Sequence, residues 1–119
     1  MGKQIGNLIP FEIEVKIGGK LRITKWNNYA FGYAEQYLKN DNVELSTEEI
    51  LEEIGKKKFR SIKAILFGAI KSSNNEYCAS QFQKDFNFEE VKNYIDVVIK
   101  GIENYLPDGK ESTKKSPNK

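Results

Sequence analysis

The stretch FEIEVKIGGKLRITKW, residues 11–26, predicts how the domain begins. Apolar and charged residues alternate in its first half, and its second half alternates with Leu21 and Ile23 as apolar members. A period of two is typical of strands that bury one face. Gly18 and Gly19 lie between the halves and supply the positive φ angles of a two-residue turn. We therefore expect a β-hairpin whose apolar residues, Leu21 and Ile23 included, face the core.

The segments after the hairpin have the spacing of amphipathic helices. Asn27 or Asn28 caps the first helix, which we expect to end at about Lys39. Ser46 and Glu49 then form a capping box, in which each side chain accepts a hydrogen bond from the backbone N–H of the other residue. This box predicts the start of a second helix.

Gly55 indicates a break, and the apolar residues that follow predict another helix over about 57–72. Residues 76–86 fit either a short helical turn or an ordered loop. Asn87 and Glu90 form a second capping box, which predicts the start of the last helix. Its apolar residues recur every three or four positions and are Phe88, Val91, Tyr94, Ile95, Val98, Ile102, Tyr105 and Leu106.

These elements predict an α+β, mostly helical fold in which an N-terminal β-hairpin packs on three to four helices. A chain of 119 residues is long enough for one domain with one core. We expect this globular domain over residues 1–107. Residues 108–119 lack large apolar side chains, so we expect a disordered polar tail there.

The composition argues against several classes of function. The chain has no histidine, one cysteine and no glycine-rich phosphate loop, so we expect no enzyme activity, cofactor or metal. The charged residues of 107–119 account for the whole net charge of +2, so the body lacks the basic surplus typical of nucleic-acid binders. The longest apolar stretch, residues 64–70, is shorter than the roughly 20 residues of a membrane span. Nucleic acid and membrane are therefore disfavoured as partners.

The single cysteine and the N-terminus bear on location. Cys78 cannot form a disulfide within the chain, which suits a reducing cytosol. Residues 1–5 offer no continuous apolar region of a secretion signal. We expect a cytoplasmic protein in which Cys78 is a small buried or half-buried apolar residue.

The charged clusters have structural interpretations beside functional ones. Four carboxylates follow the Ser46 cap and suit the positive end of a helix dipole better than a metal or an acid–base pair; they are Glu48, Glu49, Glu52 and Glu53. Asp85 and Asp96 lack neighbouring acids in the sequence and receive the same structural interpretation. The basic run of residues 56–60 could touch phosphate or an acidic partner, but the glutamates before it cancel much of its field.

Aromatic residues are dense between Trp26 and Tyr37. Core packing accounts for most of them, and a protein-binding surface could use the others, because Tyr and Trp are favoured interface anchors. The candidate protein-binding residues are Trp26, Tyr29, Tyr33 and Tyr37. We expect Trp26, at the junction of strand and helix, to be the exposed anchor; a place in the core is the alternative.

The order of these segments resembles the small tail assembly chaperones of long-tailed bacteriophages (siphoviruses) and related gene transfer agent proteins. The likeness runs from about residue 11 to 106. It comprises the hairpin, the aromatic helix, a variable acidic segment and two motifs, Phe59-Arg60-x-x-x-x-Ile65-Leu66-Phe67-x-Ala69 and Phe88-Glu89-Glu90-Val91.

This resemblance implies a non-enzymatic protein of the infected or lysogenic bacterial cell. Such a chaperone holds tail-tube subunits soluble and delivers them to the tape-measure protein. It implies no catalytic residue and no cofactor. The alternatives are a bacterial or mobile-element adaptor or regulator that acts by protein contact and, less favoured, a nucleic-acid-binding regulator. The hairpin edge could pair with a client strand or with another copy, so a homo-oligomer is also an expectation.

Overall fold

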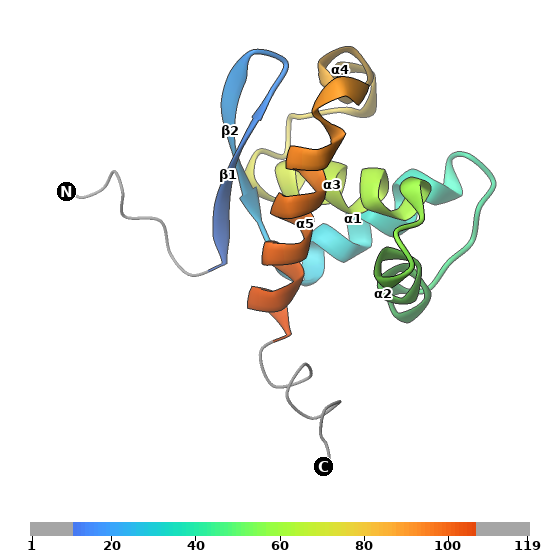
Figure 1. Cartoon of the computed structure of the whole chain (residues 1–119). Helices are drawn as coiled ribbons and strands as arrows, with labels where there is room; N and C mark the ends of the chain where they lie inside the picture. The colour runs from blue at the N-terminus through green and yellow to red at the C-terminus, as the bar shows by residue number, and fades with distance from the viewer. Residues whose placement is uncertain (1–10, 107–119) are drawn as a thin grey trace.

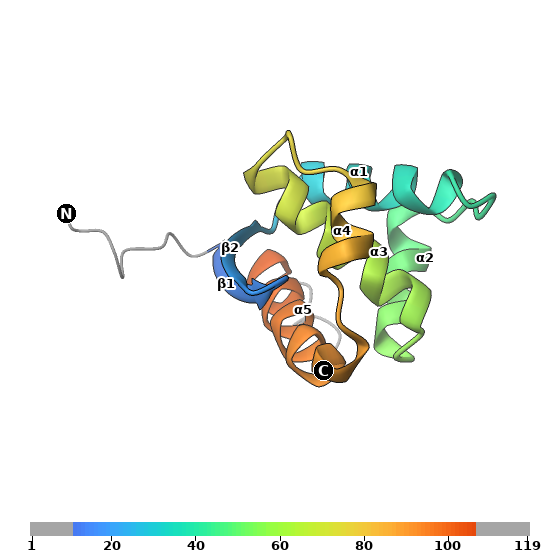
Figure 2. The same cartoon turned by 90° about the horizontal axis from the view of Figure 1, so that it is seen from above.

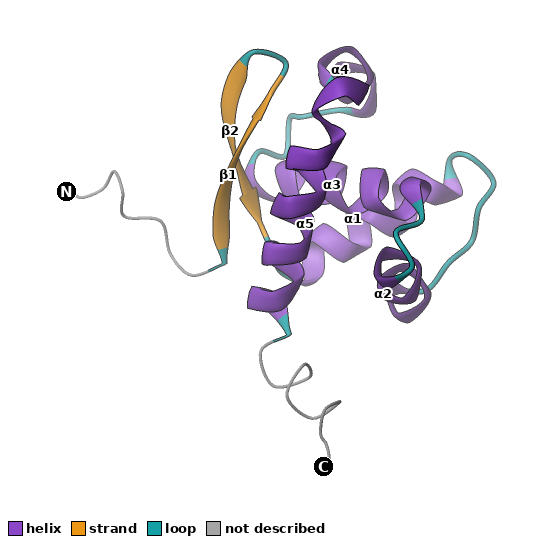
Figure 3. Ribbon diagram, in the orientation of Figure 1, coloured by secondary structure: helices purple, strands orange, loops and turns teal. Residues whose placement is uncertain are grey.

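The computed structural model describes residues 11–106; residues 1–10 and the tail expected at 108–119 lie outside this range. The elements, in chain order, are β1 (Glu12–Ile17), β2 (Lys20–Lys25), α1 (Asn28–Lys39), α2 (Thr47–Gly55), α3 (Phe59–Ser73), α4 (Ala79–Asp85), the 3₁₀ turn η1 (Phe88–Glu90) and α5 (Val91–Tyr105). The predicted α+β, mostly helical class is confirmed (Figure 3). The described range holds one α-helix more than the upper expectation of four. The additional helix is α4, which lies in residues 76–86, the segment that fitted either a short helical turn or a loop.

Helix α3 is the central element. Every residue from Ala64 to Ile70 is buried, as is typical of a helix surrounded by other elements. Its neighbours are α1, α2, α5 and β2. Figure 1 shows α5 crossing in front of α3, and Figure 2 shows the hairpin and α5 on one side of the molecule. The hairpin therefore gains from these helices the apolar contacts that an isolated hairpin lacks.

The hairpin turns at Gly18 and Gly19, as predicted. Their φ angles are +64° and +75°, in the left-handed region that glycine adopts without steric cost. The two-residue turn pairs Ile17 with Lys20. Because of this pairing, odd-numbered residues of β1 share a face of the sheet with even-numbered residues of β2.

The prediction for the buried face of β2 was wrong. Val15 and Ile17 of β1 face the core, as expected, and the register places Thr24 of β2 on the same face, with 0% exposure. Leu21 is consequently on the outer face and 69% exposed. Thr24 is compatible with burial because its hydroxyl donates to the Ile13 carbonyl at 2.6 Å.

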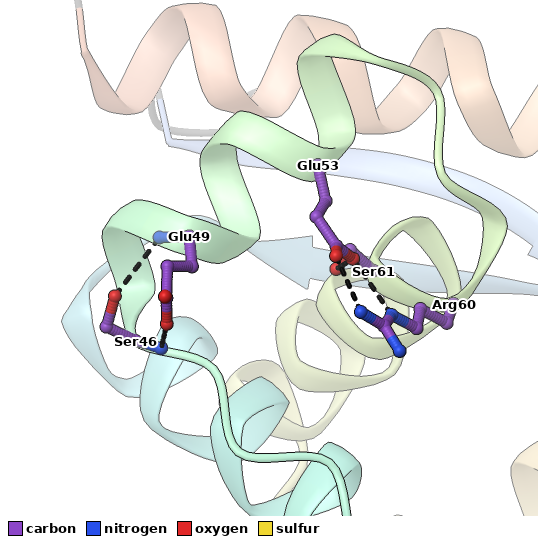
Figure 4. A network of polar contacts seen from close by, with 5 residues as sticks. All are labelled: Ser46, Glu49, Glu53, Arg60 and Ser61. Carbon is purple, nitrogen blue, oxygen red and sulfur yellow. Dashed lines mark hydrogen bonds and ion pairs between the residues drawn. The ribbon is translucent and has the colours of Figure 1, made fainter.

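Two of the three predicted helix caps form. Asn27 caps α1 by accepting from the Ala30 N–H at 3.0 Å. The Ser46–Glu49 capping box is present, with bonds of 3.1 and 2.8 Å (Figure 4). The chain breaks after Gly55, as expected.

The predicted Asn87–Glu90 capping box does not form. The Asn87 side chain accepts from the Glu89 N–H at 3.0 Å, while the Glu90 carboxylate accepts from Asn93 at 2.7 Å. The Asn87 N–H donates instead to the Tyr94 hydroxyl at 3.2 Å. The chain consequently enters α5 through the 3₁₀ turn η1.

Candidate protein-binding surface

The aromatic face of α1 carries three of the predicted binding residues. Tyr29, Tyr33 and Tyr37 recur every four positions and therefore share one side of the helix. Tyr29 is 73% exposed, whereas Tyr33 and Tyr37 are half-buried. The buried side of α1 holds Ala30, Phe31, Ala34 and Leu38.

Tyr33 and Tyr37 line an open hollow of about 210 Å³, which we call the tyrosine hollow. Its wall is formed by α1 and its C-cap, by α3 and by the start of α4. The lining residues are Tyr33, Gln36, Tyr37, Asn40, Phe67, Lys71, Cys78 and Ala79. The fold thus brings two predicted residues together with residues far away in the sequence, and Tyr29 does not line the hollow.

Aromatic contacts hold the base of the tyrosine hollow in place. The Tyr37 ring lies 5.0 Å from the Phe67 ring and meets Phe82 edge-on at 5.9 Å, measured between ring centroids. Such tilted and edge-on arrangements are the favoured ones for aromatic pairs. Phe82 is fully buried, so the base continues directly into the core.

Lys71 fixes the rim on the α3 side. Its ammonium group donates to the backbone carbonyls of Asn75 and Tyr77 at 2.9 and 2.8 Å. It also lies 5.4 Å from the centre of the Tyr33 ring, within the range of a cation–π interaction. The Tyr33 ring is therefore held on the rim before any partner arrives.

The side chains that line the tyrosine hollow include the phenol of Tyr37 and the thiol of Cys78. Burial, with the Asp41 carboxylate as a smaller cause, raises the pKa of Tyr37, so its hydroxyl keeps its proton at neutral pH. The hydrogen bond with the Ser80 hydroxyl is the main cause that lowers the pKa of the Cys78 thiol. Cys78 is exposed, so the expectation of a buried or half-buried residue was wrong. The reason is its position as N-cap of the short helix α4, at the molecular surface.

Trp26 is a core residue, and the expectation of an exposed anchor was wrong. Its side chain is 2% exposed. The indole N–H donates to the Thr24 hydroxyl at 2.8 Å, and the ring packs on Gly101 of α5. The missing Cβ at position 101 makes the space that the indole fills.

A larger hollow of about 700 Å³ lies between the hairpin turn and residues 84–94. Its rim is charged, with Lys16, Lys84 and Glu90 among the lining residues. Phe88, another of its lining residues, is 67% exposed. Aromatic residues line both hollows. The tyrosine hollow is smaller, but its lining is mostly apolar with few polar groups, as is typical of binding sites.

A buried polar cluster joins the hairpin to α4, and we call it the Asp85 cluster. The Asp85 carboxylate accepts from the Tyr77 hydroxyl at 3.0 Å and from Gln81 at 2.8 Å, and it pairs with Arg22 at 3.3 Å. Burial is the main cause that raises the pKa of Tyr77, followed by its bond to Asp85. The sequence gives no signal for this cluster, because Arg22 is far along the chain from Tyr77, Gln81 and Asp85.

Glu53 of α2 has structural partners at the start of α3. Arg60 donates two hydrogen bonds to the Glu53 carboxylate at 3.0 and 2.7 Å, and Ser61 donates a third at 2.7 Å (Figure 4). The bonds to Arg60 are the main cause that lowers the pKa of Glu53 to about 2. One cation of the basic run is therefore engaged within the protein. In residues 11–106, no three His, Cys, Asp or Glu side chains gather closely enough to hold a metal ion.

No family model, curated protein or solved structure matches this chain. The likeness to tail assembly chaperones therefore rests on the residues quoted above. Across the described part of the chain, no helix joins enough length and apolar character to cross a lipid bilayer.

Proposed function

We propose that this chain is a phage-type tail assembly chaperone, without enzymatic activity, that binds tail-tube subunits through the tyrosine hollow. The observation that carries the proposal is the gathering of Tyr33, Tyr37 and Phe67 around one open hollow with a fixed rim. Tyrosine offers a large apolar ring and a hydroxyl at low entropic cost, and it is enriched at interface hot spots. The tape-measure protein would be the partner to which the client is delivered.

The hollow suits a client that must be released. A self-assembling, β-rich tube subunit exposes apolar side chains and strand edges before it polymerises. The base of the hollow is apolar, while Gln36 and Asn40 offer polar groups among the lining residues. A hollow of about 210 Å³ accommodates one anchoring side chain and leaves most of the client uncovered. Limited contact of this kind supports reversible binding.

The alternative is a bacterial or mobile-element adaptor or regulator that uses the same hollow for another protein. A nucleic-acid-binding role is less favoured, because the body of the chain is neutral and Arg60 is held by Glu53. The alternatives differ from the chaperone in the identity of the partner. Co-expression with the tail-tube protein encoded nearest to this gene separates them.

The experiment measures polymerisation of that tube protein by light scattering, with and without the chain. We expect wild-type chain to slow polymerisation. Tyr33→Ala and Gln36→Lys should each weaken the complex about tenfold, because they change the rim and leave the core intact. Phe88→Ala is the matched control, since it removes an exposed aromatic ring outside the hollow.

Equal polymerisation rates with and without wild-type chain would refute the chaperone function. If Phe88→Ala weakened the complex as much as Tyr33→Ala, the tyrosine hollow would not be the binding site. Circular dichroism of every variant checks that the fold is retained.

A further inference from the structure

Within residues 11–106, strand β1 has an edge that no other strand covers. The sheet in this range has two strands, so each strand hydrogen-bonds to another strand on one side. The Trp26 N–H donates to the Phe11 carbonyl at 2.9 Å. In an antiparallel pair, bonded and non-bonded positions alternate along each strand. Because Phe11 is bonded to Trp26, the odd-numbered residues of β1 bond to β2, and the N–H and C=O groups of Glu12, Glu14 and Lys16 point outward, away from β2. Among residues 11–106, no backbone group of another element bonds to them.

The side chains along this edge are charged and partly unpaired. Glu12 pairs with Lys25 across the hairpin at 3.9 Å. Glu14 and Lys16 are exposed, and neither forms an ion pair within the described residues. Glu14 and Lys16, two successive residues with outward backbone groups, thus carry opposite charges and form no ion pair within the described residues.

This arrangement is self-complementary. When a second β1 pairs antiparallel about Val15, Glu14 of each copy lies opposite Lys16 of the other. Both residues have outward backbone groups, so this register also forms the main-chain bonds of a sheet. Opposite charges on directly facing residues stabilise a strand pair, and like charges destabilise it. A register centred on Glu14 would instead place the two Glu14 carboxylates face to face.

The edge of β2 lacks this property. Its sequence, KLRITK, carries three cations and no anion. No register of β2 with its own copy can therefore place opposite charges face to face. The opposite charges of Glu14 and Lys16 therefore favour β1 over β2 as the strand that pairs with a second copy.

We propose that β1 is the interface of a two-fold symmetric dimer, in which two hairpins form one four-stranded sheet in the order β2–β1–β1–β2. A two-fold contact closes on itself and leaves no further β1 edge exposed. The interface is small, so the dimer belongs to the weak, reversible class. This inference goes beyond the proposed function, because it concerns contact between copies and does not involve the client.

Charge reversal tests the dimer and its register. Sedimentation of the full chain between about 1 μM and about 1 mM should show a concentration-dependent dimer. Glu14→Lys or Lys16→Glu alone creates two like-charge contacts per dimer, and either should raise the dissociation constant about tenfold or more. The double variant, Glu14→Lys with Lys16→Glu, restores both opposite-charge contacts and should dimerise like wild type. An equimolar mixture of the two single variants should form a heterodimer.

The control is Glu89→Lys, a charge reversal at an exposed position of η1, which should leave the dissociation constant unchanged. Charged residues on edge strands also serve to prevent pairing. If they do so here, wild-type chain stays monomeric at all concentrations and the proposal is wrong. Dimerisation that the double variant fails to restore would equally overturn this register. The readout is mass, so it is independent of the tube-protein experiment.

Discussion

Trp26 of the strand-to-helix junction and Gly101 of α5 are in such close contact that a Cβ atom at position 101 would overlap the indole ring. The indole is 2% exposed and donates its N–H to Thr24 at 2.8 Å. Hairpin and last helix are thus joined through one aromatic side chain. The same contact explains why Trp26 is unavailable to a partner.

Gly101→Ala should lower the free energy of unfolding by about 1–3 kcal/mol, because the added methyl group overfills a close-packed site. Urea denaturation followed by circular dichroism measures the change. The control is Gly32→Ala in α1, where a Cβ meets no atom within 4 Å. That substitution should stabilise the protein by about 0.5–1 kcal/mol, since alanine is the better helix former. Equal effects of the two variants would contradict the Trp26–Gly101 contact.

Asp85→Asn should destabilise the protein by about 3 kcal/mol, because Arg22 loses its counter-charge at a largely buried site. The substitution keeps the size of the side chain, so the loss reports charge rather than volume. Asp96→Asn at an exposed position of α5 is the control and should change stability by less than about 0.5 kcal/mol. A matching small effect at Asp85 would show that the Asp85 cluster does not stabilise the fold.

The low pKa of Glu53 predicts an acid-sensitive contribution to stability. In the folded state this pKa is about 2, against an ordinary value of 4.5, so the folded state binds fewer protons than the unfolded state between these pH values. The contribution is therefore fully present above about pH 4.5 and is lost as pH falls towards 2. Urea denaturation at several pH values should show a shallower acid decline for Glu53→Gln. Glu52→Gln, at an exposed position of the same helix, should follow wild type.

Cys78 should report occupation of the tyrosine hollow. It is the only cysteine, it is exposed, and its lowered pKa increases the thiolate fraction at neutral pH. Ellman's reagent should therefore modify the native protein fully, and saturating client should slow the reaction. Modification that requires denaturant would contradict the exposed position. Unchanged kinetics with a bound client would place the client elsewhere.

Local sequence signals predicted much of the fold. The Gly18–Gly19 turn, the Asn27 cap, the Ser46–Glu49 box and the break after Gly55 depend on neighbouring residues, and all four are confirmed. Periodicity alone placed Leu21 on the wrong face of β2. The two-residue turn already determines which faces match, so the correct side follows from turn length combined with the pattern of β1.

The candidate site was predictable in part. Tyr33 and Tyr37 follow from aromatic density on one helix, and both line the tyrosine hollow. Phe67, Lys71 and Cys78 come from distant segments, and no local pattern indicates that α3 and α4 meet α1 there. The expectation that Trp26 is exposed was wrong, because the neighbouring sequence of an aromatic residue at a junction does not distinguish a core position from a surface position. Its burial depends on Gly101, far along the chain.

The Asp85 cluster also bears on the order of folding events. Arg22 and Asp85 are separated by most of the described chain, so their pairing must close a long loop, at an entropic cost that grows with loop length. Helices α1 and α3 meet through much shorter loops. We therefore expect the hairpin to dock on α4 late in folding, after the rate-limiting barrier. Loss of the Arg22–Asp85 pair should therefore accelerate unfolding and leave the refolding rate nearly unchanged.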